Sequence, residues 1–229
     1  MSTRLTAFRE ELLPAALFAD RAFAACSALE SGAEVFLRTG DAKNLLEEVL
    51  PLAVFAKFFD AIERRVHCRY LGGSGDEADA ELVLSGRTVE LGFYPSRILV
   101  EVTCAEDSKK AYLRREALAV QGGVFLGTDI ARSAPRHHPD SRIISRAVAQ
   151  DPDHYPSELA DLVSAAIAKK AGKHYDPPRV LVVRYDPDGF LDPAMLRSML
   201  AAVIVPEGAS GITAVFLTDC SSGNVSHVW

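Results

Sequence analysis

The sequence predicts an α/β fold in which a mixed central β-sheet is flanked by helices. Short alternating segments joined by tight turns over residues 66–103 indicate an antiparallel meander. A helix-length segment separates two apolar strands at 179–185 and 211–218, which is typical of a parallel crossover. Apolar residues at helical spacing in segments 5–30 and 42–64 supply helices to cover the sheet.

Two prolines interrupt the N-terminal helices. Residues 5–30 keep a 3.6-residue apolar rhythm, and Pro14 is expected to kink this helix or divide it in two. The second helix covers residues 42–64 with one wide apolar face, and Pro51 is expected to bend it.

The middle of the chain is rich in strand patterns. We expect four short strands, at residues 66–70, 79–84, 88–93 and 97–103. Because side chains alternate along a strand, Leu99, Glu101 and Thr103 of the last strand share one face.

The C-terminal half predicts alternating helices and strands after a long loop. The expected elements are a helix at 108–120, an Arg/His/Pro-rich loop at 127–156, a helix at 157–174, a strand at 179–185, a helix at 193–203 and a strand at 211–218. We predict a single domain that spans residues 1–229, with a helical region at residues 1–64, a core at 65–219 and a basic insertion at 104–156.

Composition is that of an ordinary globular protein. The 229 residues are 48% hydrophobic and 24% charged, which is enough for one full core. The N-terminus lacks a signal-peptide pattern and no apolar run is long enough to span a bilayer, so we expect a soluble, cytoplasmic protein. The four scattered cysteines are expected to be reduced core residues: Cys26, Cys68, Cys104 and Cys220.

One segment is basic although the net charge is −6. Residues 108–150 hold eight Lys and Arg against three acids, which fits an edge that meets a polyanion. The candidate nucleic-acid-binding residues are Lys109, Lys110, Arg114, Arg132 and Arg136. A solvated helix face followed by a polar loop explains the same charges without a partner.

Glu101 is a lone carboxylate in a strand that otherwise reads as buried. Such a group costs several kcal/mol unless it is paired, protonated or bound to a cation. Asp79 and Glu81 open another strand of the meander, so acids from two strands can meet at one end of the sheet and hold a divalent cation.

These residues resemble the restriction-endonuclease-like, or PD-(D/E)xK, nuclease superfamily. The resemblance rests on Ala78-Asp79, on Val100-Glu101-Val102-Thr103, and on a helix that leads into the strand Val180-Leu181-Val182-Val183. It implies a Mg²⁺ or Mn²⁺ site in which Asp79 and Glu101 hold the ion. Thr103 stands where that family has its lysine, and Ala78 where it often has proline.

A lysine from a neighbouring helix is the candidate replacement for the missing positive charge. The apolar stripe of the helix at 157–174 continues onto Lys170, which should therefore face the sheet. The alternative is that Lys170 extends along the protein edge with its ammonium group in solvent. The resemblance makes Asp79, Glu101 and Lys170 the candidate catalytic residues.

Further oxygen ligands are available beside the two acids. The Val102 carbonyl is a candidate ligand, and Glu81 is either a second-metal ligand or the partner of a nearby cation. Glu47 and Glu48 of the helix at 42–64 are expected to face solvent. The alternative, implied by the resemblance, is that one of them completes the metal site. Without a metal, Asp79 reads as a polar strand start and Glu101 as the partner of an arginine.

Two functions follow from the resemblance. The first is divalent-metal-dependent hydrolysis of phosphodiester bonds in nucleic acid, with DNA as the expected substrate. The second is a catalytically inactive relative that binds nucleic acid or protein. An exposed sheet edge would favour a homodimer in either case.

Overall fold

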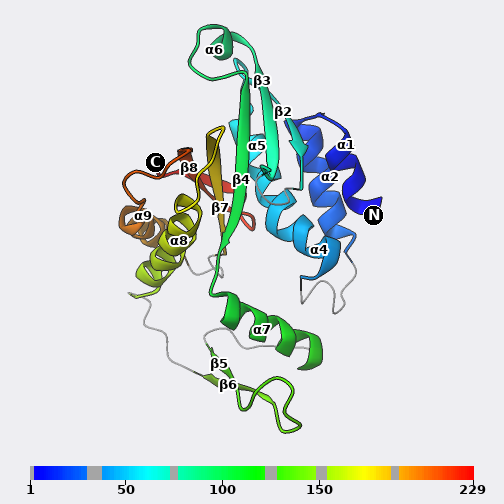
Figure 1. Cartoon of the computed structure of the whole chain (residues 1–229), viewed down its shortest axis with the longest axis vertical. Helices are drawn as coiled ribbons and strands as arrows, with labels where there is room; N and C mark the ends of the chain where they lie inside the picture. The colour runs from blue at the N-terminus through cyan, green and yellow to red at the C-terminus, as the bar shows by residue number, and fades with distance from the viewer. Residues whose placement is uncertain (1–2, 30–37, 73–76, 122–127, 148–153, 187–190) are drawn as a thin grey trace.

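The computed structural model describes residues 3–29, 38–72, 77–121, 128–147, 154–186 and 191–229. Within them, a mixed sheet of seven strands runs through the molecule with helices on both sides (Figure 1). The strands, in their order across the sheet, are β1 (Leu13–Pro14), β2 (Arg65–Tyr70), β3 (Ala80–Ser85), β4 (Arg97–Ala105), β7 (Arg179–Tyr185), β8 (Ile212–Asp219) and β9 (Asn224–His227). The predicted α/β class and mixed sheet are confirmed.

Strand directions follow the predicted pattern. β2, β3 and β4 form an antiparallel meander. β4 pairs in parallel with β7, and β7 pairs in parallel with β8. Parallel neighbours need crossover connections, and α8 (Tyr155–Ala171) and α9 (Pro193–Ala202) lie in those connections. The crossover predicted between the strands at 179–185 and 211–218 is confirmed.

The two faces of the sheet pack against different helices (Figure 1). One core joins the sheet to α1 (Thr3–Glu10), α2 (Ala15–Ser27), the π-helix η1 (Leu45–Val49) and α5 (Leu50–Phe59). The short helix α4 (Gly40–Asn44) leads directly into η1. The other joins β4, β7 and β8 to α8 and α9. Glu101 and Thr103 belong to the second face because Val100 and Val102 point into the first core.

The N-terminal helices differ from the prediction in their ends. Pro14 lies between α1 and α2 and pairs with His67 of β2, so the first helix is divided rather than kinked. The second helix ends at Phe59, earlier than the expected residue 64, because the chain turns at Ala61 and Arg64 to begin β2. Between α4 and α5 the helix widens into η1, which the sequence pattern does not indicate.

The predicted strand at 88–93 is wrong. Gly86, with φ of 105°, starts a single helical turn, α6 (Arg87–Glu90). Local bonds from the Val89 and Glu90 amides to the Gly86 carbonyl hold that turn. Leu91 and Phe93 are exposed, and no strand among the described residues pairs with them, so their apolar character does not produce a sheet.

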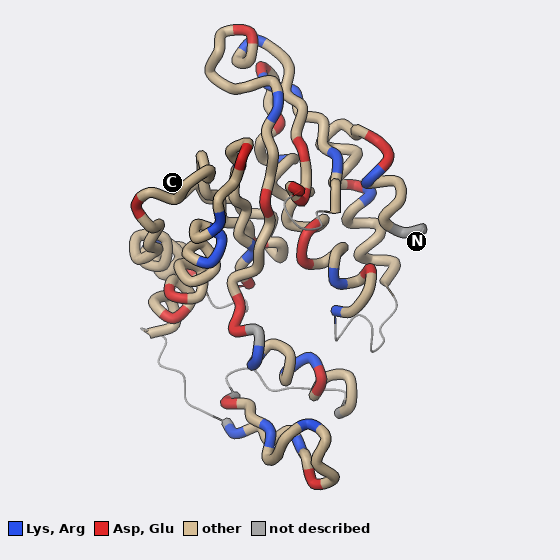
Figure 2. The backbone as a smooth tube through the Cα atoms, in the orientation of Figure 1, with Lys and Arg blue, Asp and Glu red and all other residues tan. Residues whose placement is uncertain are grey.

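α7 (Ser108–Gln121) and the hairpin of β5 (Thr128–Arg132) with β6 (Ile143–Ala147) form a small lobe below the sheet (Figure 1). The prediction of a loop over 127–156 is therefore wrong for the hairpin. Lys and Arg recur along α7 and the hairpin (Figure 2). The lobe has its own small core of Leu113, Ala117 and Ile130, with Ile143 packed against it.

Replacing Leu113 by alanine is expected to loosen the lobe while leaving the central sheet intact. Leu113 is 5% exposed and packs in the small core of the lobe rather than in either core of the sheet. Its truncation is expected to favour opening of the lobe by roughly 2–3 kcal/mol. Hydrogen exchange should show faster exchange of amides in β5 and β6 but not in β7. Leu91→Ala, at an exposed leucine, is the control, and equal loss of protection in β7 would contradict the expectation.

The remaining predictions concern short segments. The helix at 157–174 is α8, which starts two residues earlier and ends at Ala171. The tail adds the edge strand β9, which pairs with β8. The sequence also indicates a short extended segment at 33–38 and a short apolar segment at 124–126, which lie mostly and wholly outside the described residues. In the portion of the chain that is described, no helix has the length and apolar character needed to cross a bilayer.

Candidate functional site

β3 and β4 separate next to the predicted acids. Their antiparallel pairing ends at Ala80 and Val100, whereas β4 continues beside β7 to Ala105. Asp79 immediately precedes β3, and its Oδ2 accepts a hydrogen bond of 2.7 Å from the Val102 amide. The side chain thus takes the place of a backbone partner. Because the N–H and C=O groups of one strand residue point to the same side, the Val102 carbonyl is directed toward Asp79 as well.

Glu101 lies between two cations. Its Oε1 accepts from Lys170 Nζ at 2.5 Å, and its Oε2 accepts from Arg179 Nη1 at 2.7 Å. The Glu101 and Arg179 side chains are buried and that of Lys170 is 16% exposed. Lys170 therefore points toward the sheet, as its helical spacing predicts, and not into solvent.

Arg179 is the site residue that the sequence analysis missed. It begins β7, its guanidinium lies 4.6 Å from the centre of the Tyr175 ring, and it pairs with Glu101. A charged residue at the start of the apolar run Val180-Leu181-Val182-Val183 was the available signal. The arginine partner suggested by the metal-free interpretation of Glu101 and the lysine suggested by the resemblance are both present.

Asp79 has a strongly altered affinity for protons. Burial is the main cause that raises the pKa of its carboxyl group to about 7. The negative charges of Glu101 and Glu48 act in the same direction, whereas the Val102 amide and Lys170 oppose the shift. Burial disfavours the ionised carboxylate, and the two neighbouring acids add to that cost. A bound cation would favour the ionised form, which is the property expected of a metal ligand.

Glu47 and Glu48 do not face solvent as expected. Both are half-buried on η1, and the Tyr70 hydroxyl of β2 donates a short hydrogen bond to Glu48 Oε2. The negative charge of Glu48 also contributes to the raised pKa of Asp79. The correction has a physical reason: a π turn places neighbouring residues at different angles from an α-helix, so the helical wheel used for the prediction does not apply.

Glu81 is the partner of nearby cations, one of the two roles left open for it. The residue is 4% exposed, its Oε1 is paired with Arg69, and its Oε2 accepts from Arg97 Nε at 3.0 Å. Both of its oxygens are therefore engaged by arginines.

The donor set for a metal is small. Among the residues that the structure describes, no three His, Cys, Asp or Glu side chains are grouped so that they could hold an ion. Two carboxylates and the Val102 carbonyl remain, and Mg²⁺ commonly takes one or two carboxylates and keeps several waters. These are the donors that an ion of that kind would use, and both oxygens of Glu101 already accept hydrogen bonds from Lys170 and Arg179. Thr103, beside Val183 of β7, adds no charge.

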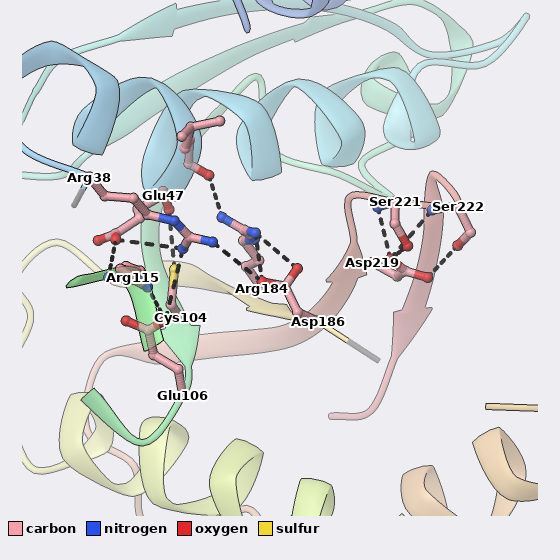
Figure 3. Close-up of polar contacts among 11 residues, drawn as sticks. Arg38, Glu47, Cys104, Glu106, Arg115, Arg184, Asp186, Asp219, Ser221 and Ser222 are labelled. Atoms are coloured by element: carbon pink, nitrogen blue, oxygen red, sulfur yellow. Dashed lines mark hydrogen bonds and ion pairs between the residues drawn. The ribbon is translucent and has the colours of Figure 1, made fainter. Parts of the chain in front are cut away.

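A second polar cluster, of acids and arginines, lies farther along β4 and β7 (Figure 3). Arg184 Nη1 donates to the Leu46 carbonyl at 2.8 Å, and its Nη2 donates to both oxygens of Asp186. Burial and the charges of Arg184 and Arg115 lower the pKa of Arg38. The other members are Glu47, Glu106 and Cys104, so the cluster fastens η1 and the first turns of α7 to the end of the sheet.

The predicted nucleic-acid-binding residues differ in how free they are. Lys109 and Lys110 are exposed at the start of α7, and Arg114 is half-buried there. Arg136 is exposed, with its guanidinium 5.3 Å from the Tyr112 ring centre. Arg132, in contrast, is 16% exposed and paired with Glu116. Arg132 therefore stabilises the lobe and offers little surface to a ligand.

Comparison with protein-family models, curated proteins and solved structures finds no significant match.

Proposed function

We propose that the protein hydrolyses phosphodiester bonds in nucleic acid with the help of a divalent metal ion. The observation that carries the proposal is the convergence of Asp79, Glu101 and Lys170 at the point where β3 and β4 separate. The same arrangement supports the assignment to the restriction-endonuclease-like superfamily, with DNA as the expected substrate.

Asp79, Glu101 and the Val102 carbonyl would hold Mg²⁺ or Mn²⁺. When bound, such an ion supplies a Lewis acid that polarises a phosphate and activates water. Lys170 provides the positive charge that Thr103 lacks, from a helix rather than from β4. Arg179 fixes the orientation of the Glu101 carboxylate. On the lobe, the groups proposed to meet the phosphate backbone are Lys109, Lys110, Arg114 and Arg136.

Metal-dependent cleavage is expected to disappear when either acid is replaced. We expect Glu101→Ala and Asp79→Asn to lower cleavage of plasmid and oligonucleotide DNA, with Mg²⁺ or Mn²⁺ present, by at least about a hundredfold. Glu63→Ala, at an exposed acid of the turn before β2, is the control. Each variant is assayed below its own melting temperature. Absence of metal-dependent cleavage by the wild type, on DNA and RNA alike, would overturn the proposal.

The role of Lys170 has a separate test. Lys170→Ala is expected to lower kcat by roughly 10²–10³-fold, the usual effect of removing one group that stabilises transition-state charge. Thr103 shares the sheet face of Glu101, so Lys170→Ala combined with Thr103→Lys should recover part of the activity. Lys169→Ala is the matched control on the same helix. Loss of stability in Lys170→Ala with unchanged kcat would assign the lysine a structural role only.

The inactive-relative function is favoured by one observation. Both oxygens of Glu101 are already hydrogen-bonded to cations, so the carboxylate is satisfied without a metal. In that case the wild type binds nucleic acid or protein, calorimetry shows no uptake of Mn²⁺, and Asp79→Asn changes neither result.

A further inference from the structure

The meander β2-β3-β4 has one face that the N-terminal helices do not cover. Val66, Cys68 and Tyr70 of β2 lie in the core with those helices. Because side chains alternate, Arg65, His67 and Arg69 project from the opposite face. Every second residue of β2 is thus basic or titratable on the side away from the core.

The strand register extends this pattern across the sheet. His67 stands opposite Val83, and Val83 stands opposite Arg97 of β4. Arg69 stands opposite Glu81 in the next row of the same face. Arg65, Arg69 and Arg97 therefore form one group on both sides of β3, here named the arginine strip.

The arginine strip is positively charged and open. The side chains of Arg65 and Arg97 are each 62% exposed and that of Arg69 is 39% exposed. Glu81, which pairs with Arg69 and Arg97, is buried beneath them, and Asp60 lies 3.9 Å from Arg65. A concentration of arginines on one sheet face is complementary to a polyanion, in a chain whose net charge is −6.

The strip leads to the candidate site. β3 runs from Ser85, opposite Arg65, to Ala80, next to Asp79. The distance along the strand from Ser85 to Asp79 is about 20 Å at the usual rise of a strand. Glu101 projects from the same face of β4 as Arg97, because the two residues are four apart on one strand.

We propose that the arginine strip binds the backbone of a single strand of nucleic acid and guides it to Asp79 and Glu101. The inference rests on the proposed function, since continuity with a phosphodiester-cleaving site is what favours nucleic acid over other polyanions. Guanidinium groups of Arg65 and Arg97 contact phosphates. Phe93, 72% exposed and four residues before Arg97, offers a ring on which one base stacks.

The test measures binding to the full chain without turnover. Fluorescence anisotropy with a labelled single-stranded oligonucleotide is recorded in EDTA over a series of salt concentrations. Arg65→Gln combined with Arg97→Gln should weaken binding and reduce the slope of log affinity against log salt by about 1.4, or about 0.7 per lost phosphate contact. Phe93→Ala should weaken binding about fivefold or more. Replacement of both arginines by lysine should restore most of the affinity.

Lys57→Gln combined with Arg197→Gln removes the same charge from exposed positions on α5 and α9, and is the matched control. If both double variants weaken binding equally, or if the wild type does not bind, the strip is not the binding surface. If the Arg65→Gln and Arg97→Gln double variant weakens binding to a duplex as much as binding to the single strand, the single-strand assignment is overturned.

Cleavage assays separate this inference from the proposed function. If binding depends on the arginine strip but no cleavage occurs in Mg²⁺ or Mn²⁺, the proposed reaction is wrong and the binding surface is supported. If the Arg65→Gln and Arg97→Gln double variant cleaves with an unchanged KM, the arginine strip is not the binding surface and the proposed reaction is supported.

Discussion

Replacing Glu101 by alanine is expected to destabilise the protein by about 3–5 kcal/mol, because it leaves two cations in a buried place without their partner. Arg179 is 5% exposed at its side chain and Lys170 is 16% exposed, so water cannot replace the lost carboxylate freely. The midpoint of urea unfolding at neutral pH measures the effect, and the slope of the transition should stay constant.

An exposed ion pair provides the control for this prediction. Glu11 accepts from Arg21 at 2.8 Å, with side chains 54% and 39% exposed, and Glu11→Ala is expected to cost about 0–1 kcal/mol. Combining Glu101→Ala with Arg179→Met should recover part of the loss, since it removes one uncompensated charge. A loss for Glu101→Ala as small as that for Glu11→Ala would show that the buried pairs contribute nothing to stability.

The second large effect is a stabilisation by Asp79→Asn that depends on pH. Burial raises the pKa of Asp79 to about 7 in the folded state, above the ordinary value of about 3.9 expected in the unfolded chain. Between these values the folded state holds a proton that the unfolded state has released. Stability therefore falls as the pH rises from about 4 to about 7 and stays low above that range.

The shift corresponds to about 4 kcal/mol at pH 8 if it is fully expressed. Asparagine cannot ionise, and its side-chain oxygen can still accept from the Val102 amide. Asp79→Asn should therefore be more stable than the wild type at pH 8 and similar at pH 4. Urea unfolding at pH 4, 6 and 8 measures the difference, with Asp161→Asn on the exposed side of α8 as control. A difference that is the same at all three pH values would contradict the assigned cause.

Metal addition connects this prediction with the proposed function. A divalent ion at Asp79 favours the ionised carboxylate, so Mg²⁺ or Mn²⁺ should raise the melting temperature of the wild type at pH 8 and have little effect at pH 5. Asp79→Asn should lose that response. The same ions should shift the melting temperature of Asp161→Asn by the same amount as that of the wild type.

Local apolar patterns predicted the helices and strands whose apolar side chains are buried in the folded protein. β7 matches its predicted bounds because Arg179 to Tyr185 is buried throughout, and a run of that kind leaves little choice of structure. The residues at 88–93 carry similar β-propensity but pair with no strand in the described part of the chain, and local hydrogen bonds to the Gly86 carbonyl form a helical turn instead. β5 and β6 escaped prediction because polar and proline residues dominate their connection.

The candidate site was predictable to some extent for the same reason. Glu101 and Lys170 each carry charge on an apolar pattern, which marks them as residues that need a partner. Glu48 could not be found this way, since its direction depends on η1, and a π turn leaves no clear trace in apolar spacing. The hydrogen bond between Asp79 and Val102 depends on where β3 and β4 separate, a tertiary property.

The wide helical turn η1 makes the N-terminal helices of the protein sensitive to insertions and deletions of single residues. Glu47 and Glu48 are adjacent, yet one meets Arg38 and Arg115 while the other meets Tyr70. Deleting a single residue from this turn would restore ordinary α-helical winding and rotate the preceding side chains by about 100°. Insertions and deletions between Leu45 and Val49 should therefore be much less tolerated than substitutions of similar bulk.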